Sequence, residues 1–147
     1  MKSTQLLAVF FVIALVFLAV QYSGILKRVS SKEIKVGGAR FYVEVADTPI
    51  ARARGLSGRD SLASDSGMLF LFSEPGTQVF WMKDMKFPID IIWIKGEKVI
   101  GMVIGAEPED EEDYELYKSP EPVDKVLEIN AGLVSRLGIK VGDQIAF

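Results

Sequence analysis

The 147-residue chain contains no cysteine and no histidine. Without cysteine it can form no disulfide, thiolate nucleophile or lipid-modified anchor, and without either residue it lacks the usual zinc ligands. A serine triad that depends on histidine is excluded as well. Any acid–base chemistry therefore depends on Asp, Glu, Lys or Tyr, and we predict neither a bound metal nor a cofactor.

A strong excess of charge of either sign is also missing. Seventeen Lys and Arg face twenty Asp and Glu, which gives a net charge of −3. This near balance does not favour nucleic acid as a partner. The length suits one domain with a short appendage.

The appendage is an apolar N-terminal segment. The run from Leu6 to Leu26 follows the basic Lys2. A helix needs about 20 residues to span a bilayer, and this run is long enough. No small-x-small cleavage pattern follows it, so we favour an uncleaved signal anchor over residues 1–28 to a cleaved signal peptide. A linker over residues 29–32 would then lead to a single domain over residues 33–147. We expect that domain to be extracytoplasmic, because a lone N-terminal apolar segment before a soluble domain is usually an export signal.

Short strands dominate the predicted domain. EIKV and RFYVEVA alternate with period two around Gly37-Gly38 and predict a hairpin. GMLFLF is a continuous apolar run of strand length, which indicates burial on both faces. PIDIIWI, KVIGMVIGA, KVLEI and DQIAF supply further strands. Short helices are expected over residues 50–56 and from a cap at Asn130 to Leu137. The fold class is therefore all-β, a compact sandwich or barrel with two short helices.

Five motifs occur in a characteristic order, namely RARGLSGRDSL, GMLFLF, FWMKDMKFPIDIIWI, VLEINAG and LGIKVGD. On these motifs the chain from residue 40 to 147 resembles the domain of unknown function family 192. The resemblance implies a jelly-roll-like β-sandwich, often preceded by an export signal or anchor, and implies no activity. The family usually has Asn-Thr after Trp-Met-Lys, where this chain has Asp84-Met85. The resemblance therefore gives Asp84 no catalytic role.

The stretch FWMKDMKFPIDIIWI places charges among aromatic and branched residues. Asp90 lies in a strand of Ile and Trp, where an ionised carboxylate needs a cation and hydrogen bonds. Lys83, Lys86 or an arginine of RARG could supply the cation. Two interpretations stay open. The charges are either a structural polar network, or a binding or acid–base site with Asp90 as carboxylate, Lys83 as cation and Asp84 beside them.

The motif RARGLSGRDSL offers a second candidate site. Gly55 and Gly58 permit positive φ at a helix exit, and exposed N–H groups beside Arg54 and Arg59 could hold a carboxylate, sulfate or phosphate. The alternative is a helix stop whose arginines pack over aromatic rings or pair with Asp60 and Asp90. No phosphate-loop spacing is present, so a nucleotide is not predicted.

The aromatic residues and the acidic segment complete the candidates. Trp81 and Trp93 are more often core residues in such strands, but a tryptophan beside these charges could instead serve as a platform for a sugar ring. The segment 107–115 is acidic without EF-hand spacing, and it is either a solvated loop or a contact surface for a protein partner.

These features suggest three functions. The first is a module that binds an envelope glycan or small polar ligand through Arg54, Trp81, Lys83, Asp84 and Asp90. The second is a hydrolase using Asp90 with Glu128 or Asp84 as an acid–base pair. The third is an accessory subunit that docks a partner through the acidic loop.

Overall fold

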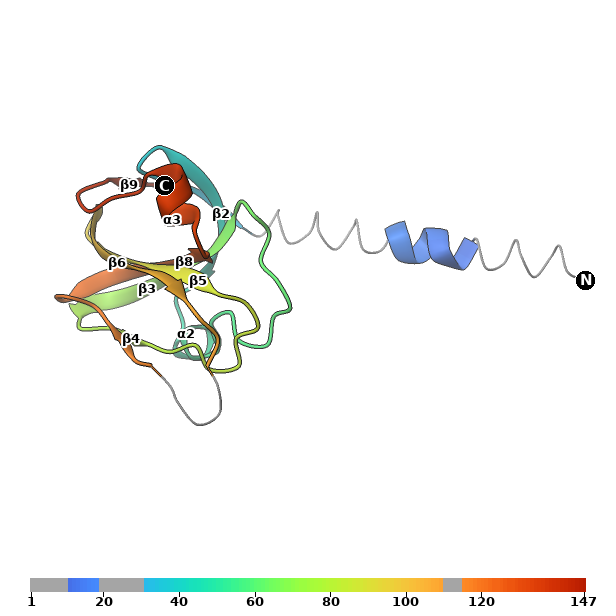
Figure 1. The fold of residues 1–147 in the computed structure, drawn as a ribbon, viewed down its shortest axis with the longest axis horizontal. Helices are drawn as coiled ribbons and strands as arrows, with labels where there is room; N and C mark the ends of the chain where they lie inside the picture. Colours follow the sequence, from blue (N-terminus) through green and yellow to red (C-terminus); the bar gives the residue numbers. More distant parts are fainter. Residues whose placement is uncertain (1–10, 19–30, 110–114) are drawn as a thin grey trace, which may run out of the picture. The chain divides into compact units, whose positions relative to one another are not determined.

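The computed structural model describes residues 11–18, 31–109 and 115–147 (Figure 1). Residues 11–18 are helical, with apolar side chains that are exposed. Within the described residues, no helix has the length and apolar character needed to cross a membrane. Most of the predicted span over residues 6–26 lies outside the described residues. Lys32–Phe147 forms a separate compact unit, and the candidate site belongs entirely to that unit.

The compact unit is built mainly from strands, and its principal sheet has seven of them in the order β6-β5-β8-β3-β2-β1-β9. Two further strands, β4 and β7, form a separate antiparallel pair. The elements in chain order are β1 (Lys32–Val36), β2 (Ala39–Ala46), α2 (Pro49–Arg54), β3 (Ser66–Gly76), β4 (Val79–Phe80), β5 (Ile89–Lys95), β6 (Lys98–Ala106), β7 (Tyr117–Lys118), β8 (Val123–Asn130), α3 (Leu133–Leu137) and β9 (Ile145–Ala146).

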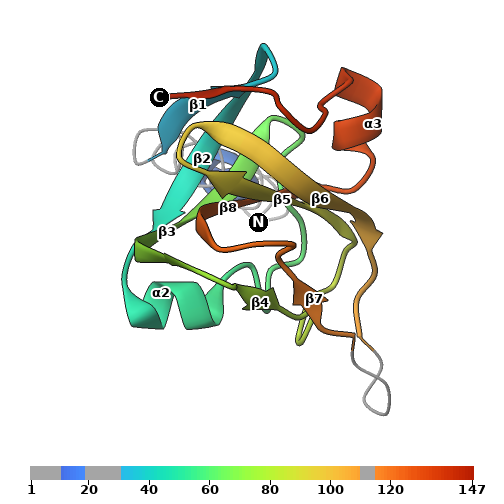
Figure 2. The same ribbon diagram turned by 90° about the vertical axis from the view of Figure 1, so that its left-hand side faces the viewer.

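The seven-stranded sheet curls into a half-barrel (Figure 2). A bridge between Lys98 and Gln144 joins its two edge strands at one end. The hydrogen bond from the Ile145 N–H to the Glu97 carbonyl, 2.9 Å, supports the same closure. The expected β-rich class with two short helices is confirmed for the compact unit. The jelly-roll description fits less well, because β2 and β3 are parallel and α2 lies in the connection between them.

Local sequence accounts for most strands. The hairpin of β1 and β2 turns at Gly37 and Gly38, whose φ values of 56° and 87° suit a residue without a side chain. The run GMLFLF lies in β3, where Met68 and Phe70 face one cluster of buried side chains and Leu69 faces another. Burial on both faces, as the unbroken apolar run predicts, is therefore confirmed.

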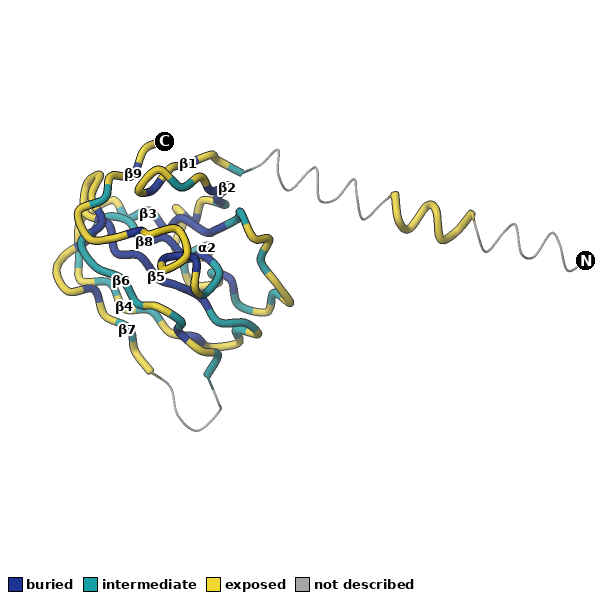
Figure 3. Tube along the Cα trace, turned by 45° about the horizontal axis from the view of Figure 1, so that its top comes forward, coloured by how far each residue is buried: buried dark blue, intermediate teal, exposed yellow. Residues whose placement is uncertain are grey.

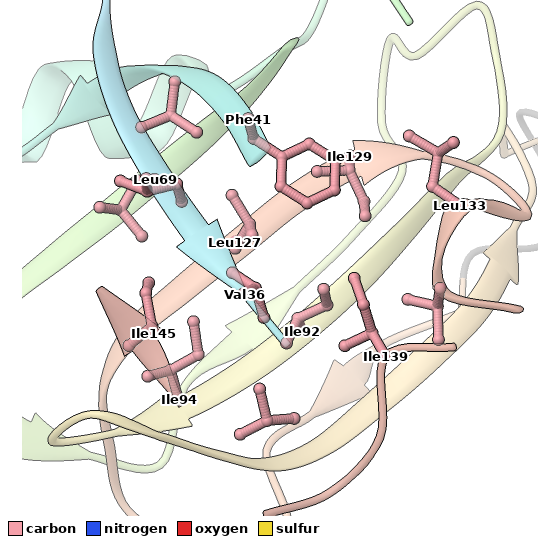
Figure 4. Close-up of a cluster of buried hydrophobic side chains, with 14 residues drawn as sticks. Val36, Phe41, Leu69, Ile92, Ile94, Leu127, Ile129, Leu133, Ile139 and Ile145 are labelled. Carbon is pink, nitrogen blue, oxygen red and sulfur yellow. The ribbon is translucent and has the colours of Figure 1, made fainter. Parts of the chain in front are cut away.

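The inner cluster fills the concave side of the sheet (Figure 4). It consists of fourteen buried residues, among them Phe41, Leu69, Ile92, Leu127 and Ile129, and α3 covers part of it through Leu133 and Val134. Figure 3 shows that buried segments concentrate in the strands while most connecting loops are exposed. Burial of this apolar surface is the main force that holds the sheet in its curled form.

The outer cluster lies on the opposite face and underlies the candidate site. It contains Leu56, Met68, Phe70, Ile91 and Trp93 together with Ala46, Met82, Ile89, Ala106, Val123 and Val126. In both views α2 and β4 lie on this side of the sheet, and α3 lies on the other (Figures 1 and 2). This face of the sheet is covered only by short elements and loops, including α2 and β4, and a cavity remains between them.

Two local predictions need correction. Asn130 does not cap α3, because the residue at the cap is Gly132 with no side-chain hydrogen bond, and the side chain of Asn130 instead donates to the carbonyls of Leu62 and Ala63. No strand was predicted between KVIGMVIGA and KVLEI, but β7 lies there and pairs with β4, which is about forty residues earlier in the chain. Neither long-range contact has a local sequence signal.

Candidate functional site

A cavity of about 220 Å³ opens on the outer face of the sheet. Its walls come from α2 and the turn after it, from β3, from the segment around β4, and from one residue of β8. The lining residues are Arg52, Ala53, Arg54, Gly55, Leu56, Ser57, Phe70, Phe72, Gln78, Val79, Phe80, Trp81, Met85 and Glu128. Two sequence motifs, RARGLSG and the beginning of FWMKDM, thus meet at one cavity.

Glu128 is the polar group at the buried side of this cavity. It lies in β8 between Met68 of β3 and Ile91 of β5, so its nearest strand neighbours on this face are apolar. Only 5% of Glu128 is exposed, and its Oε2 atom is buried without a hydrogen-bond partner. Burial raises the pKa of the carboxyl to about 8, against a smaller opposing effect of the Arg59 charge. Near neutral pH Glu128 is therefore mainly an uncharged carboxylic acid.

Arg59 is already occupied by another acid. Its two terminal nitrogens donate to both carboxylate oxygens of Glu44, at 2.6 and 2.7 Å. This pairing raises the pKa of Arg59 and compensates most of its charge. Arg59 therefore influences Glu128 only at a distance, and the bidentate bond belongs to the framework around the site.

The helix α2 and its exit turn position the arginines. The Thr48 side chain accepts from the Ala51 N–H at 3.1 Å, Pro49 opens the helix, and Gly55 ends it with φ of 51°. A side chain at Gly55 would also approach the Phe70 ring at 3.4 Å. The turn at Gly55 therefore keeps the chain close to the cavity wall.

Arg52 ties α2 to the sheet. Its Nη1 donates to the carbonyls of Asp47 and Leu71, at 2.7 and 2.9 Å, and its guanidinium lies 5.2 Å from the centre of the Phe72 ring. Arg54, the last residue of α2, is exposed at the cavity, and its side chain has no interaction partner among the residues that the structure describes. Arg54 is thus available to a ligand, whereas Arg52 already supports the wall.

Aromatic rings form much of the wall. Phe70 and Phe80 meet edge to face with ring centres 4.9 Å apart, and Phe80 meets Trp93 in the same way at 5.6 Å. Trp93 is buried core, as one of the two sequence interpretations had it. Trp81 lines the cavity and is 53% exposed, so a large part of its ring is accessible to a ligand.

Lys83 and Asp84 lie next to the cavity but do not line it. The Ser57 hydroxyl donates to the Lys83 carbonyl at 2.9 Å, and the Gly58 N–H donates to the Asp84 carbonyl at 2.8 Å. Asp84 has φ of 58°, the only positive φ of a residue other than glycine in the described part of the chain. Its side chain borders a separate, shallower depression with Ser57, Gly58, Met85 and Lys86. Lys86 itself pairs with Asp60 at 2.6 Å.

Asp90 is on the other face of the sheet. It is fully buried and accepts hydrogen bonds from the N–H groups of Gly105, Gly132 and Val134, at 2.9, 3.1 and 2.8 Å. The last two tie the start of α3 to β5. Of the five residues in the sequence hypothesis, the structure brings Arg54 and Trp81 to one cavity, places Lys83 and Asp84 beside it, and separates Asp90 from it.

Glu128 was named from the sequence only as a partner for Asp90 in the hydrolase hypothesis. The strand register places Asp90 opposite Ile129 and Glu128 opposite Ile91, so the two carboxyls face opposite sides of the sheet. The one local signal for Glu128 is a lone acid in the apolar strand KVLEI. The aromatic wall residues of β3 and β4 were predicted only as strand residues.

Two remaining expectations concern partners. The acidic segment 107–115 falls largely on residues 110–114, which lie outside the described residues. In the part of the chain that is described, no group of three or more His, Cys, Asp or Glu side chains could hold a metal ion. Glu109 contributes to local structure, since its Oε1 accepts from the Met82 N–H at 2.6 Å.

The comparisons with known proteins agree with the resemblance. Residues 32–147 match the model of the DUF192 family, described as "Uncharacterized ACR". A protein of unknown function from Novosphingobium aromaticivorans DSM 12444 is 35% identical, with a TM-score of 0.74 over 80% of this chain and 85% of that one. A "putative transcription regulator" from Sinorhizobium meliloti 1021 is 34% identical, with a TM-score of 0.72 over 80% and 95%. No curated protein matches the chain.

Proposed function

The chain belongs to the DUF192 family, whose description names no activity, and we propose from the site itself that residues 32–147 form a ligand-binding module. The ligand is a small polar molecule, such as a sugar unit of an envelope glycan, that enters the cavity between Trp81 and Glu128. The observation that carries this proposal is the unpartnered Oε2 of the buried Glu128. A buried polar atom without a partner costs roughly 1–3 kcal/mol. Because Oε2 has almost no accessible surface, a bound ligand would supply the missing hydrogen bond once the carboxyl group turns this oxygen toward the cavity.

Binding is better supported than hydrolysis. Acid–base hydrolysis needs two carboxyl groups that flank one bond, and Glu128 is the only acid among the residues that line the cavity. Asp90 faces the other side of the sheet and is satisfied by three backbone N–H groups. Although the Sinorhizobium relative is described as a regulator of transcription, the net charge of −3 here does not favour nucleic acid.

The proposal includes a location. The apolar run over residues 6–26 would tether the module to a membrane and hold it outside the cytoplasm. Membrane fractions washed with alkaline carbonate should retain the full chain, and protease added outside intact cells with a permeable outer layer should degrade the module. Release by carbonate, or protection from the protease, would contradict this location.

A ligand screen tests the binding function. Thermal unfolding of the protein is measured with a set of monosaccharides, amino sugars and small organic acids, and then with Trp81→Ala. A ligand of the cavity raises the unfolding temperature of the wild type, and Trp81→Ala removes that increase because it removes the exposed ring. Val141→Ala is the matched control, since Val141 is 62% exposed and does not line the cavity. An increase that survives Trp81→Ala would place the ligand elsewhere.

A further inference from the structure

The charges on the cavity wall are of one sign. Arg52 and Arg54 both line it, and Glu128 is its only acid. Arg52 donates to two neutral carbonyl oxygens, which leave its positive charge in place. The Arg54 side chain has no partner among the described residues. Arg59 is paired with Glu44 away from the wall, and among the described residues that line the cavity no acid other than Glu128 stands opposite these two arginines.

Glu128 does not cancel the positive charge of the cavity wall near neutral pH. Burial raises the Glu128 pKa to about 8, so the side chain is mainly protonated and carries a hydroxyl that can donate. A buried carboxylic acid kept neutral in this way is an effective donor toward a ligand oxygen. The cavity therefore offers two cationic groups and one neutral donor, a set that suits an anion bearing acceptor oxygens.

The walls and the size define the body of the ligand. Phe70, Phe72, Phe80 and Trp81 present rings, and Leu56 and Met85 add apolar surface. A volume of about 220 Å³ exceeds the roughly 150 Å³ of an engineered cavity that holds benzene. One six-membered ring with one or two substituents fits this space.

Resting on the binding function proposed above, we infer that the cavity takes a small organic anion with a flat apolar ring, of the aromatic carboxylate class. Its ring lies against Trp81 and the phenylalanines, its negative charge is held by Arg54, and Glu128 donates a hydrogen bond to one of its oxygens. The anion-binding role that the motif RARGLSG suggested is thereby assigned to Arg54 at this cavity.

The inference requires a definite pH dependence. A ligand that accepts from protonated Glu128 binds tightly below the Glu128 pKa and is repelled once Glu128 ionises. Met68 and Ile91, which flank Glu128 on β3 and β5, carry no titratable group. The charged groups nearest to it are Arg52 and Arg54 at the cavity and Arg59, whose pKa is raised by its hydrogen bonds to Glu44. The pKa of Tyr117, which packs against the outer cluster, is raised to about 12.

The test compares three probes that share one ring, namely benzoate, benzyl alcohol and benzylamine, binding to the full chain in neutral detergent. Affinity is measured by tryptophan fluorescence and by calorimetry at about pH 6 and about pH 9.5. Benzoate should bind at least tenfold more tightly than benzylamine at the lower pH, and its affinity should fall about tenfold or more at the higher pH. Arg54→Gln should weaken benzoate about tenfold and leave benzyl alcohol unchanged. Arg136→Gln, at an exposed arginine of α3, is the matched control.

Glu128→Gln separates a contact from a structural role. Its amide keeps a donor but cannot ionise, so benzoate should bind with no fall at the higher pH. Independently, the ¹³C signal of the Glu128 carboxyl should titrate at higher pH when benzoate is present, because the ligand favours the protonated form. An unchanged titration, or equal pH dependence in wild type and Glu128→Gln, would remove Glu128 from the ligand contact.

The outcomes distinguish the two proposals. Tighter binding of benzylamine than of benzoate overturns the anion class and leaves a ligand-binding module in place. Binding of neutral sugars alone, abolished by Trp81→Ala, does the same. If none of the three probes and no member of the sugar and acid set binds in the cavity, both the anion class and the binding function fail.

Discussion

The buried acid at the cavity should make folding depend on pH in a specific way. The pKa of Glu128 rises from 4.5 to about 8 on folding, because burial disfavours the charged form. Its contribution to stability is therefore fully present below about pH 4.5, decreases between the two values, and stays lost above about pH 8. One pKa unit corresponds to about 1.4 kcal/mol. The free energy of unfolding should therefore lose roughly 5 kcal/mol across this pH interval through the ionisation of Glu128.

Glu128→Gln removes that dependence because its side chain is neutral at every pH. Urea unfolding of residues 32–147, the compact unit, would be measured for both proteins between about pH 4 and pH 9 in steps of one unit. Relative to the wild type, the variant should gain about 1.4 kcal/mol per pH unit within the interval and reach a plateau near roughly 5 kcal/mol above it. The constant offset from exchanging an acid for an amide does not affect this slope.

The control is Glu97→Gln, at an exposed acid of the turn between β5 and β6, which should follow the wild type at every pH. A flat difference between Glu128→Gln and wild type would refute the reasoning. It would mean that Glu128 keeps an ordinary pKa, through water or a contact that compensates burial. The neutral-donor argument for the cavity would then fail as well.

Three further changes test the framework. Asp90→Asn places an amide against backbone N–H donors and should lower the free energy of unfolding by about 2–4 kcal/mol; a loss under about 1 kcal/mol in urea would contradict this. Gly67→Ala brings a methyl to 2.7 Å from the Glu128 carbonyl oxygen, which is part of the backbone and cannot rotate away. The free energy of unfolding should fall by about 1–3 kcal/mol. Wild-type stability in the same assay would contradict this and would mean that the two strands can move apart to admit the methyl. Arg59→Gln removes a charge that favours ionised Glu128, so the carboxyl should titrate at still higher pH by ¹³C NMR; an unchanged or lower pKa would show that Glu44, once released, or the backbone dominates.

Much of the fold was predictable because its signals are local. The glycine pair at Gly37-Gly38 and the unbroken run in β3 specify a turn and a strand without help from distant residues. The pairing of β4 with β7 and the cap of α3 were not predictable, because each depends on residues far apart in the chain. Sheet order and curvature belong to the same class of long-range information.

The candidate site divides in the same manner. Arg54 and Trp81 could be singled out from residue type and a helix exit, and both line the cavity. The phenylalanines that form the apolar wall of the cavity could not be found in this way. Phe70 and Phe80 look like ordinary strand residues until β4 folds over β3 and their rings meet.

The two acids of neighbouring strands show why residue type alone assigns the wrong weight to a buried charge. Asp90 and Glu128 are both buried, and a lone acid in an apolar strand attracts attention equally in either strand. Three backbone N–H groups satisfy Asp90, and two of them belong to the start of α3, so these hydrogen bonds compensate the burial of Asp90 and hold α3 against the sheet. Glu128 leaves one oxygen without a partner among apolar neighbours, and burial there costs stability. A cost that the fold does not recover is expected where function requires it, and for this reason the cavity above Glu128 is where a ligand should be sought.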